Sequence, residues 1–118
     1  MPKSDFPDWE IYIRDYCICR YCGISGIQDF HSWRHLQIDH VVPKEHGGSQ
    51  GAGNKVVCCA RCNQLLRDRK PEGATFAEQV EWKRAIIRDK IRGEFRDFEE
   101  MMRELLPLLW SPNTQERG

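Results

Sequence analysis

Two Cys-x-x-Cys motifs, Cys19-Arg20-Tyr21-Cys22 and Cys59-Ala60-Arg61-Cys62, decide how this 118-residue chain folds. A gap of two residues lets both thiolates of one motif reach one ion at about 2.3 Å, and two such motifs complete a tetrahedral zinc site. The 36 residues between the motifs exceed the roughly 15–20 residues of a zinc ribbon. We therefore predict a structural zinc site that encloses a strand, a loop and a second strand. Its ligands are Cys19, Cys22, Cys59 and Cys62.

Two other uses of the six cysteines have to be weighed against zinc. Three disulfides would be typical of a secreted protein, but we expect neither a secretory leader nor a membrane span in this sequence, and hence a cytoplasmic protein. A redox-active pair is the second alternative, which two matched motifs disfavour. Cys17 and Cys58 have no partner at this spacing, and we expect both to be small buried residues.

The segment between the motifs has a simple predicted organisation. Residues 36–42 favour a strand that is stopped by Pro43, and residues 44–54 form a long loop with four glycines. Residues 55–58 favour a return strand, and residues 59–69 a helix. The fold class is therefore α+β, a hairpin and a helix held by one zinc site.

The flanking segments are predicted to be helical. Aromatic and apolar residues within the first sixteen have helical spacing, and Thr75-Phe76-Ala77-Glu78 is a capping box that begins an amphipathic helix ending near Pro107. We expect the apolar stripe of that helix to pack against the N-terminal aromatic residues, although a dimer interface is the alternative. A single domain of residues 1–118, acting as a monomer, follows. The stripe consists of Ile87, Ile91, Phe95, Phe98, Met102, Leu105 and Leu109.

Composition constrains the partner only weakly. The chain is 31% charged and 40% apolar, which excludes a disordered chain, and its formal net charge is zero. Between Ile11 and Lys70 there are nine Lys or Arg against five Asp or Glu, although a tetrathiolate zinc site would reduce this surplus by two. Charge therefore permits binding to DNA without predicting it.

Polar residues of a distinctive order lie between and beside the two motifs. They are Asp39-His40 before Val41-Val42-Pro43, the pair Gly47-Gly48, Asn54, and Asn63 directly after Cys62. A lone histidine in a strand is more often structural than catalytic. Taken together with the two cysteine motifs, however, residues 17–70 resemble the HNH endonucleases of the ββα-metal fold, in their zinc-knuckle subtype.

The resemblance implies a role for each matching residue. His40 would be the general base, Asp39 and Asn63 the ligands of a catalytic metal ion, and Asn54 a brace for the loop that helps to orient His40. Neutral imidazole suits the removal of a proton from water near neutral pH. Hard oxygen ligands favour Mg²⁺ or Mn²⁺. The chain has Leu66 where the family often has a lysine.

The resemblance also implies a substrate, which is DNA, cut to 5′-phosphate and 3′-hydroxyl ends. We expect nicking of duplex DNA with weak sequence preference, and no membrane partner. The alternative is a zinc-knuckle module that binds nucleic acid without cutting it. The candidate contacts to the DNA backbone are Lys44, Lys55, Arg61, Arg67, Arg69 and Lys70.

Overall fold

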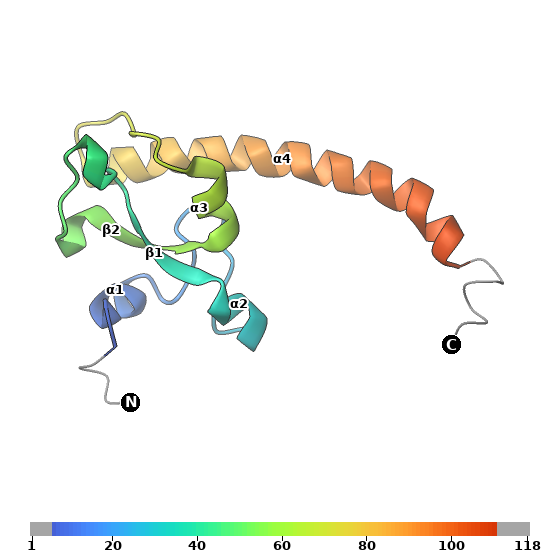
Figure 1. The fold of residues 1–118 in the computed structure, drawn as a ribbon, viewed down its shortest axis with the longest axis horizontal. Helices are drawn as coiled ribbons and strands as arrows, with labels where there is room; N and C mark the ends of the chain where they lie inside the picture. The colour runs from blue at the N-terminus through green and yellow to red at the C-terminus, as the bar shows by residue number, and fades with distance from the viewer. Residues whose placement is uncertain (1–5, 111–118) are drawn as a thin grey trace. The chain divides into compact units, whose positions relative to one another are not determined.

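The computed structural model describes residues 6–110. Its centre is an antiparallel hairpin of β1 (Leu36–His40) and β2 (Lys55–Cys59), followed at once by helix α3 (Ala60–Leu66) (Figure 1). The remaining helices are α1 (Trp9–Arg14), α2 (Phe30–Arg34) and α4 (Phe76–Leu109). The predicted α+β class, with hairpin, helix and long C-terminal helix, is confirmed. Within residues 6–110, sequence reasoning missed the short α2 and two single-turn helices in the loop between the strands.

The hairpin is in register along its whole length, with Ile38 opposite Val57 and His40 opposite Lys55. Every residue of β2 after Lys55 is buried, so this strand forms the floor of the core. The loop between the strands contains two single-turn helices, η2 (Lys44–His46) and η3 (Ala52–Asn54). Apolar side chains from α3 and the start of α4 complete the core, among them Leu66, Val80 and Ile87.

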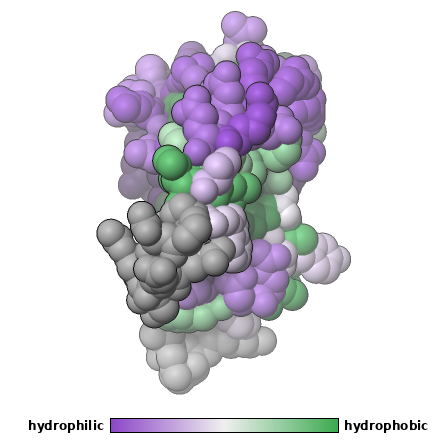
Figure 2. Space-filling view, turned by 90° about the vertical axis from the view of Figure 1, so that its right-hand side faces the viewer, coloured by the Kyte–Doolittle hydropathy of each residue, from purple (hydrophilic) through white to green (hydrophobic). Residues whose placement is uncertain are grey.

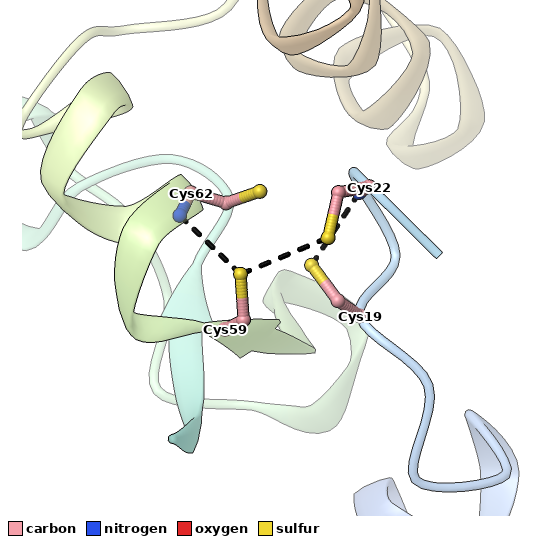
Figure 3. Close-up of side chains that lie close together, drawn as sticks. All are labelled: Cys19, Cys22, Cys59 and Cys62. Atoms are coloured by element: carbon pink, nitrogen blue, oxygen red, sulfur yellow. Dashed lines mark hydrogen bonds between the residues drawn. The ribbon is translucent and has the colours of Figure 1, made fainter. Parts of the chain in front are cut away.

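The four predicted zinc ligands meet in one place. Their Sγ atoms all lie within 4.8 Å of one another, and those of Cys22 and Cys59 are 3.7 Å apart (Figure 3). Sulfurs at the corners of a tetrahedron around zinc lie about 3.8 Å apart. A disulfide would need about 2.05 Å instead. The cluster therefore fits the predicted zinc site.

Backbone hydrogen bonds tie both knuckles to the hairpin. The amide of Arg20 donates to the carbonyl of Val57 at 2.9 Å, which attaches the first knuckle to β2. Cys59 lies at the end of β2 and is also the N-cap of α3, since its Sγ accepts from the amide of Cys62 at 3.4 Å. Gly23 takes a φ of 85°, a conformation that closes the turn of the first knuckle and disfavours other residues. A metal bound here would therefore hold the end of β2 and the start of α3 together.

Crowding of the four thiols changes how readily each one ionises. Hydrogen bonds from Cys22 and then from other thiols lower the pKa of Cys19 well below its usual value. A hydrogen bond to Cys19 raises the pKa of Cys59, but those with Cys22 and Cys62 outweigh it and bring this pKa down to about 7. Hydrogen bonds with Cys19 raise the pKa values of Cys22 and Cys62 in turn, so only Cys19 and Cys59 favour the thiolate form that zinc requires.

The two remaining cysteines behave differently from each other. Cys58 is fully buried, as predicted, and its thiol donates to the carbonyl of Cys59 at 3.2 Å. Cys17 is only half-buried and adopts a positive φ of 53°, so the prediction of burial is wrong for this residue.

Helix α4 begins as the sequence predicts. The Thr75 hydroxyl accepts from the amide of Glu78 at 3.2 Å and donates to its carboxylate at 2.9 Å, which is a capping box. The helix runs to Leu109 instead of ending near Pro107. A proline so close to the end of a helix removes only one hydrogen bond of the last turn.

The chain divides into two compact units between Arg88 and Asp89. Within the first unit, α4 buries Val80, Lys83 and Ile87. In the second unit, Phe95 is 57% and Phe98 55% exposed. Figure 2 shows hydrophobic residues at the surface of the molecule beside hydrophilic ones. The prediction that the whole stripe is buried is therefore wrong beyond Ile87.

The N-terminal aromatic residues, which were expected to cover the stripe, contact other aromatic residues of the first unit. Phe6 contacts Trp9, Tyr12 and Trp33, with ring centroids between 5.4 and 6.0 Å apart. These rings therefore pack against one another. None of the helices in residues 6–110 is both long enough and apolar enough to span a lipid bilayer.

The geometry of the cluster predicts the effect of removing one thiolate. Cys59→Ser replaces a soft zinc ligand with a poor one and weakens the cap of α3, so the protein should lose zinc and unfold. Structural zinc contributes about 10 kcal/mol or more to folding. Metal analysis and thermal unfolding, with the exposed Ser49→Ala as a matched control, measure both effects. Retention of bound zinc and of the wild-type melting temperature would contradict the assignment.

Candidate active site

Three of the four predicted catalytic residues border one cavity of about 250 Å³. Asp39 and His40 line it at the end of β1, and Asn63 lines it from the first turns of α3. The predicted DNA contacts Lys44 and Arg67 also line it. Ends of strands and helices leave backbone groups and side chains accessible, which explains why the cavity lies here.

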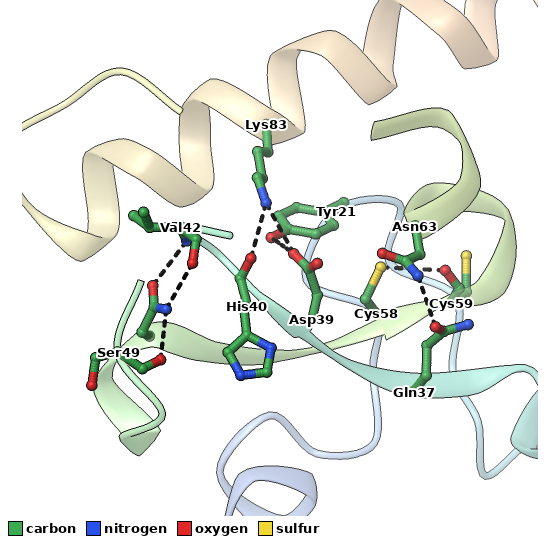
Figure 4. Close-up of polar contacts among 11 residues, drawn as sticks. Tyr21, Gln37, Asp39, His40, Val42, Ser49, Cys58, Cys59, Asn63 and Lys83 are labelled. Atoms are coloured by element: carbon green, nitrogen blue, oxygen red, sulfur yellow. Dashed lines mark hydrogen bonds and ion pairs between the residues drawn. The ribbon is translucent and has the colours of Figure 1, made fainter. Parts of the chain in front are cut away.

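Asp39 is held by two donors on the same carboxylate oxygen. The Tyr21 hydroxyl donates to Oδ2 at 2.7 Å and the Lys83 ammonium donates to it at 3.1 Å (Figure 4). The Asp39 side chain is only 9% exposed and that of Lys83 is fully buried. Within residues 6–110, Oδ1 of Asp39 accepts no hydrogen bond. Burial, and then the charge of Asp39, raise the pKa of Tyr21 far above its usual value, so its hydroxyl remains a donor.

Neither Tyr21 nor Lys83 was predicted to belong to the site. Tyr21 lies inside the first knuckle, where the Cys-x-x-Cys pattern specifies only the two cysteines. The sequence does carry a signal for Lys83, because it occupies a core-facing position of α4 between Val80 and Ile87. A charged residue in an apolar stripe is seldom buried without a partner of opposite charge.

His40 leaves the strand on the side opposite to Asp39, as alternation along a strand requires (Figure 4). Its Nε2 lies 3.0 Å from Oε1 of Gln50. A carbonyl oxygen only accepts hydrogen bonds, so Nε2 carries the hydrogen and the lone pair is on Nδ1. Gln50 therefore selects the tautomer in which Nδ1 is the basic atom. Sequence reasoning missed Gln50, which has no distinguishing context within the glycine-rich loop.

Asn63 is oriented by a second glutamine. Its Nδ2 donates to Oε1 of Gln37 at 2.8 Å, and its Oδ1 has no hydrogen-bond partner in the described part of the chain. Figure 4 shows this oxygen on the side that faces Asp39. The Asn63 amide thus presents an oxygen where the cavity is lined by a carboxylate.

Asn54 is buried away from the cavity and braces the loop. Its Oδ1 accepts from the amide of Val42 at 2.9 Å, and its Nδ2 donates to the carbonyls of Val42 and Ser49 at 3.0 and 2.9 Å. It does not bond to the His40 imidazole. Gly48 packs so closely that a Cβ atom there would lie 1.7 Å from the Val42 carbonyl oxygen. The loop therefore packs against the end of β1, next to His40.

The six predicted DNA contacts fall into two groups. Lys44, Arg67, Arg69 and Lys70 are exposed. Lys55 instead forms an ion pair with Asp8 at 3.1 Å, and Arg61 donates to Gln64 at 2.9 Å beside a separate hollow. Leu66, at the position where the family often has lysine, is 1% exposed and belongs to the core. Phosphate contacts from this helix turn would have to come from Arg67.

The comparisons with known proteins give one match. Residues 19–69 match the family model described as HNH endonuclease. Neither the curated proteins nor the solved structures contain a match to the chain. The matched segment begins at the first zinc ligand and ends just after α3, so it includes both knuckles, the hairpin and every predicted catalytic residue. Residues 19–69 are therefore similar to the HNH endonuclease family, and the four-cysteine cluster in this segment fits its zinc-knuckle form.

Proposed function

We propose that this protein is a metal-dependent DNA endonuclease that hydrolyses phosphodiester bonds to 5′-phosphate and 3′-hydroxyl ends. One observation supports it most directly: Asp39, His40 and Asn63 border the same cavity, and each has one polar atom fixed by a neighbour and another left unbonded within residues 6–110. Such pre-positioning is what a reaction site needs.

The carboxylate and the amide are suited to hold a divalent cation. Oδ1 of Asp39 and Oδ1 of Asn63 are both hard oxygen donors, which favour Mg²⁺ or Mn²⁺ over softer metals. When bound, such a cation supplies Lewis-acid stabilisation of charge on the phosphate and the departing oxygen. Two protein ligands leave coordination positions for water and phosphate.

His40 is the residue suited to accept the proton of the attacking water. Its Nδ1 carries the lone pair because Gln50 holds Nε2, and its side chain is half-exposed at the end of β1. A neutral imidazole in a fixed tautomer accepts a proton near neutral pH without a large cost. Asn54 contributes indirectly, since it fixes the loop that carries Gln50.

The exposed cations explain how DNA would be bound. Lys44 and Arg67 line the cavity, and Arg69 and Lys70 follow on the same exposed segment. Contacts of this kind go to phosphate and carry little sequence information. We therefore propose sequence-tolerant, salt-sensitive binding of duplex DNA in the cytoplasm, where reduced thiols can hold zinc.

A non-catalytic binding module is the second candidate, and one observation favours it. Asp39 already has a cationic partner in Lys83, so a metal ion would have to share this carboxylate. The two candidates differ in what His40 does, because a module that only binds DNA needs no general base.

His40→Ala should therefore reduce plasmid cleavage by about 100-fold or more while zinc content and melting temperature stay unchanged. Asn63→Ala should raise the concentration of Mg²⁺ or Mn²⁺ needed for half-maximal cleavage, since it removes a metal ligand and not the base. His31→Ala, at an exposed position outside the cavity, is the matched control. Wild-type cleavage by the His40 variant would favour the binding module or a contaminating nuclease.

The product distribution tests how many strands are cut in one encounter. One chain carries one site, so a monomer should convert supercoiled plasmid to open circles before any linear form appears. The burial that argued for a monomer is absent at four positions of the stripe, because Ile91, Phe95, Phe98 and Leu109 are exposed. Light scattering should accompany the time course for this reason. Linear product at the earliest times from a dimeric protein would contradict nicking and leave the site assignment intact.

A further inference from the structure

Lys83 is the buried charge that no part of the proposed reaction yet uses. It lies on the third turn of α4, between Val80 and Ile87, and its side chain is fully buried. Its ammonium group contacts two adjacent residues of β1, Oδ2 of Asp39 at 3.1 Å and the backbone carbonyl of His40 at 3.3 Å. It also lies 5.8 Å from the centroid of the Tyr21 ring.

The Lys83 ammonium group shares its oxygen of the Asp39 carboxylate with a second donor, the Tyr21 hydroxyl. Tyr21 and Lys83 donate to the same oxygen, Oδ2, at 2.7 and 3.1 Å. A carboxylate with both donors on one oxygen cannot rotate freely, so the direction of the other oxygen is fixed. The contact to the His40 carbonyl fixes the backbone of the neighbouring residue from the same ammonium group.

We infer that Lys83 is a positioning residue of the nuclease: with Tyr21 it clamps Oδ2 of Asp39 and leaves Oδ1 as the oxygen that binds the catalytic cation. This inference rests on the proposed function. It gives the first turns of α4, which lie outside the segment that matches the family, a part in the reaction site.

Lys83 has two effects that oppose each other, an electrostatic effect on metal binding and a geometric effect on the cleavage rate. Its positive charge repels a divalent cation bound to the other oxygen of the same carboxylate, so it weakens metal binding. Its hydrogen bonds hold the ligand and the His40 backbone where the reaction needs them, and small misplacements of reacting groups are costly in rate. Removal of Lys83 should therefore tighten metal binding and slow cleavage together. A variant with a damaged fold would instead bind the metal more weakly and cleave more slowly.

The test uses the zinc-loaded full-length protein and Mn²⁺. Lys83→Met should lower the Mn²⁺ concentration for half-maximal plasmid nicking by about threefold, because the repulsion is gone. It should also reduce the rate at saturating Mn²⁺ by about tenfold or more. Lys90→Met, at an exposed position of the same helix, should change neither quantity. A wild-type rate for Lys83→Met at saturating Mn²⁺, or a higher half-maximal concentration, would overturn the inference.

Tyr21→Phe separates geometry from charge and covers the case in which Lys83→Met does not fold. It removes one neutral donor from Oδ2 of Asp39, so the half-maximal Mn²⁺ concentration should stay within about twofold while the saturated rate falls. An unchanged saturated rate would count against the clamp.

Direct binding of Mn²⁺, followed by the loss of the free-ion electron paramagnetic resonance signal, distinguishes this inference from the proposed function. If the wild-type protein does not cleave DNA, the proposed function fails. Tighter Mn²⁺ binding by Lys83→Met than by wild type, abolished when Asp39→Ala is added, would still support the clamp. Equal binding by Lys83→Met and wild type would overturn it.

Discussion

The rest of this structure depends on the close approach of the two cysteine knuckles. The two knuckles are separated by 36 residues in sequence, but in the structure the Sγ atoms of Cys22 and Cys59 lie only 3.7 Å apart. Cys59 ends β2 and caps α3, so the same contact sets the angle between strand and helix. Asp39 on β1 and Asn63 on α3 meet at one cavity only because that angle is fixed. A core this small needs such a constraint.

The side chains proposed to be catalytic depend on a second layer of residues that orients them. Gln50 determines which nitrogen of His40 is basic, Gln37 turns the Asn63 amide, and the Asn54 side chain holds the loop with three hydrogen bonds. Each of these contacts joins segments that are at least five residues apart in sequence. The cavity is therefore a property of the closed hairpin and not of any single motif.

The sequence was sufficient to predict the parts of the fold and of the site that depend on local spacing. The cysteine motifs, the turn signals and the capping box at Thr75 each act over a few residues, and the structure has the elements they predict. Partners between distant segments were not predictable. Nothing near Lys83 in sequence indicates that it meets Asp39, and the aromatic residues that were expected to cover the stripe of α4 pack against Trp33 instead. Burial of a stripe depends on which surface is available, which periodicity alone does not reveal.

Anomalous scattering from crystals of the zinc-loaded protein soaked in Mn²⁺ tests the central claim most directly, because it locates both metals. The account predicts a zinc peak among the sulfurs of Cys19, Cys22, Cys59 and Cys62, and a separate manganese peak in the cavity lined by Asp39 and Asn63. Manganese found only at the cysteine cluster, or no peak in the cavity beside Asp39, would contradict it.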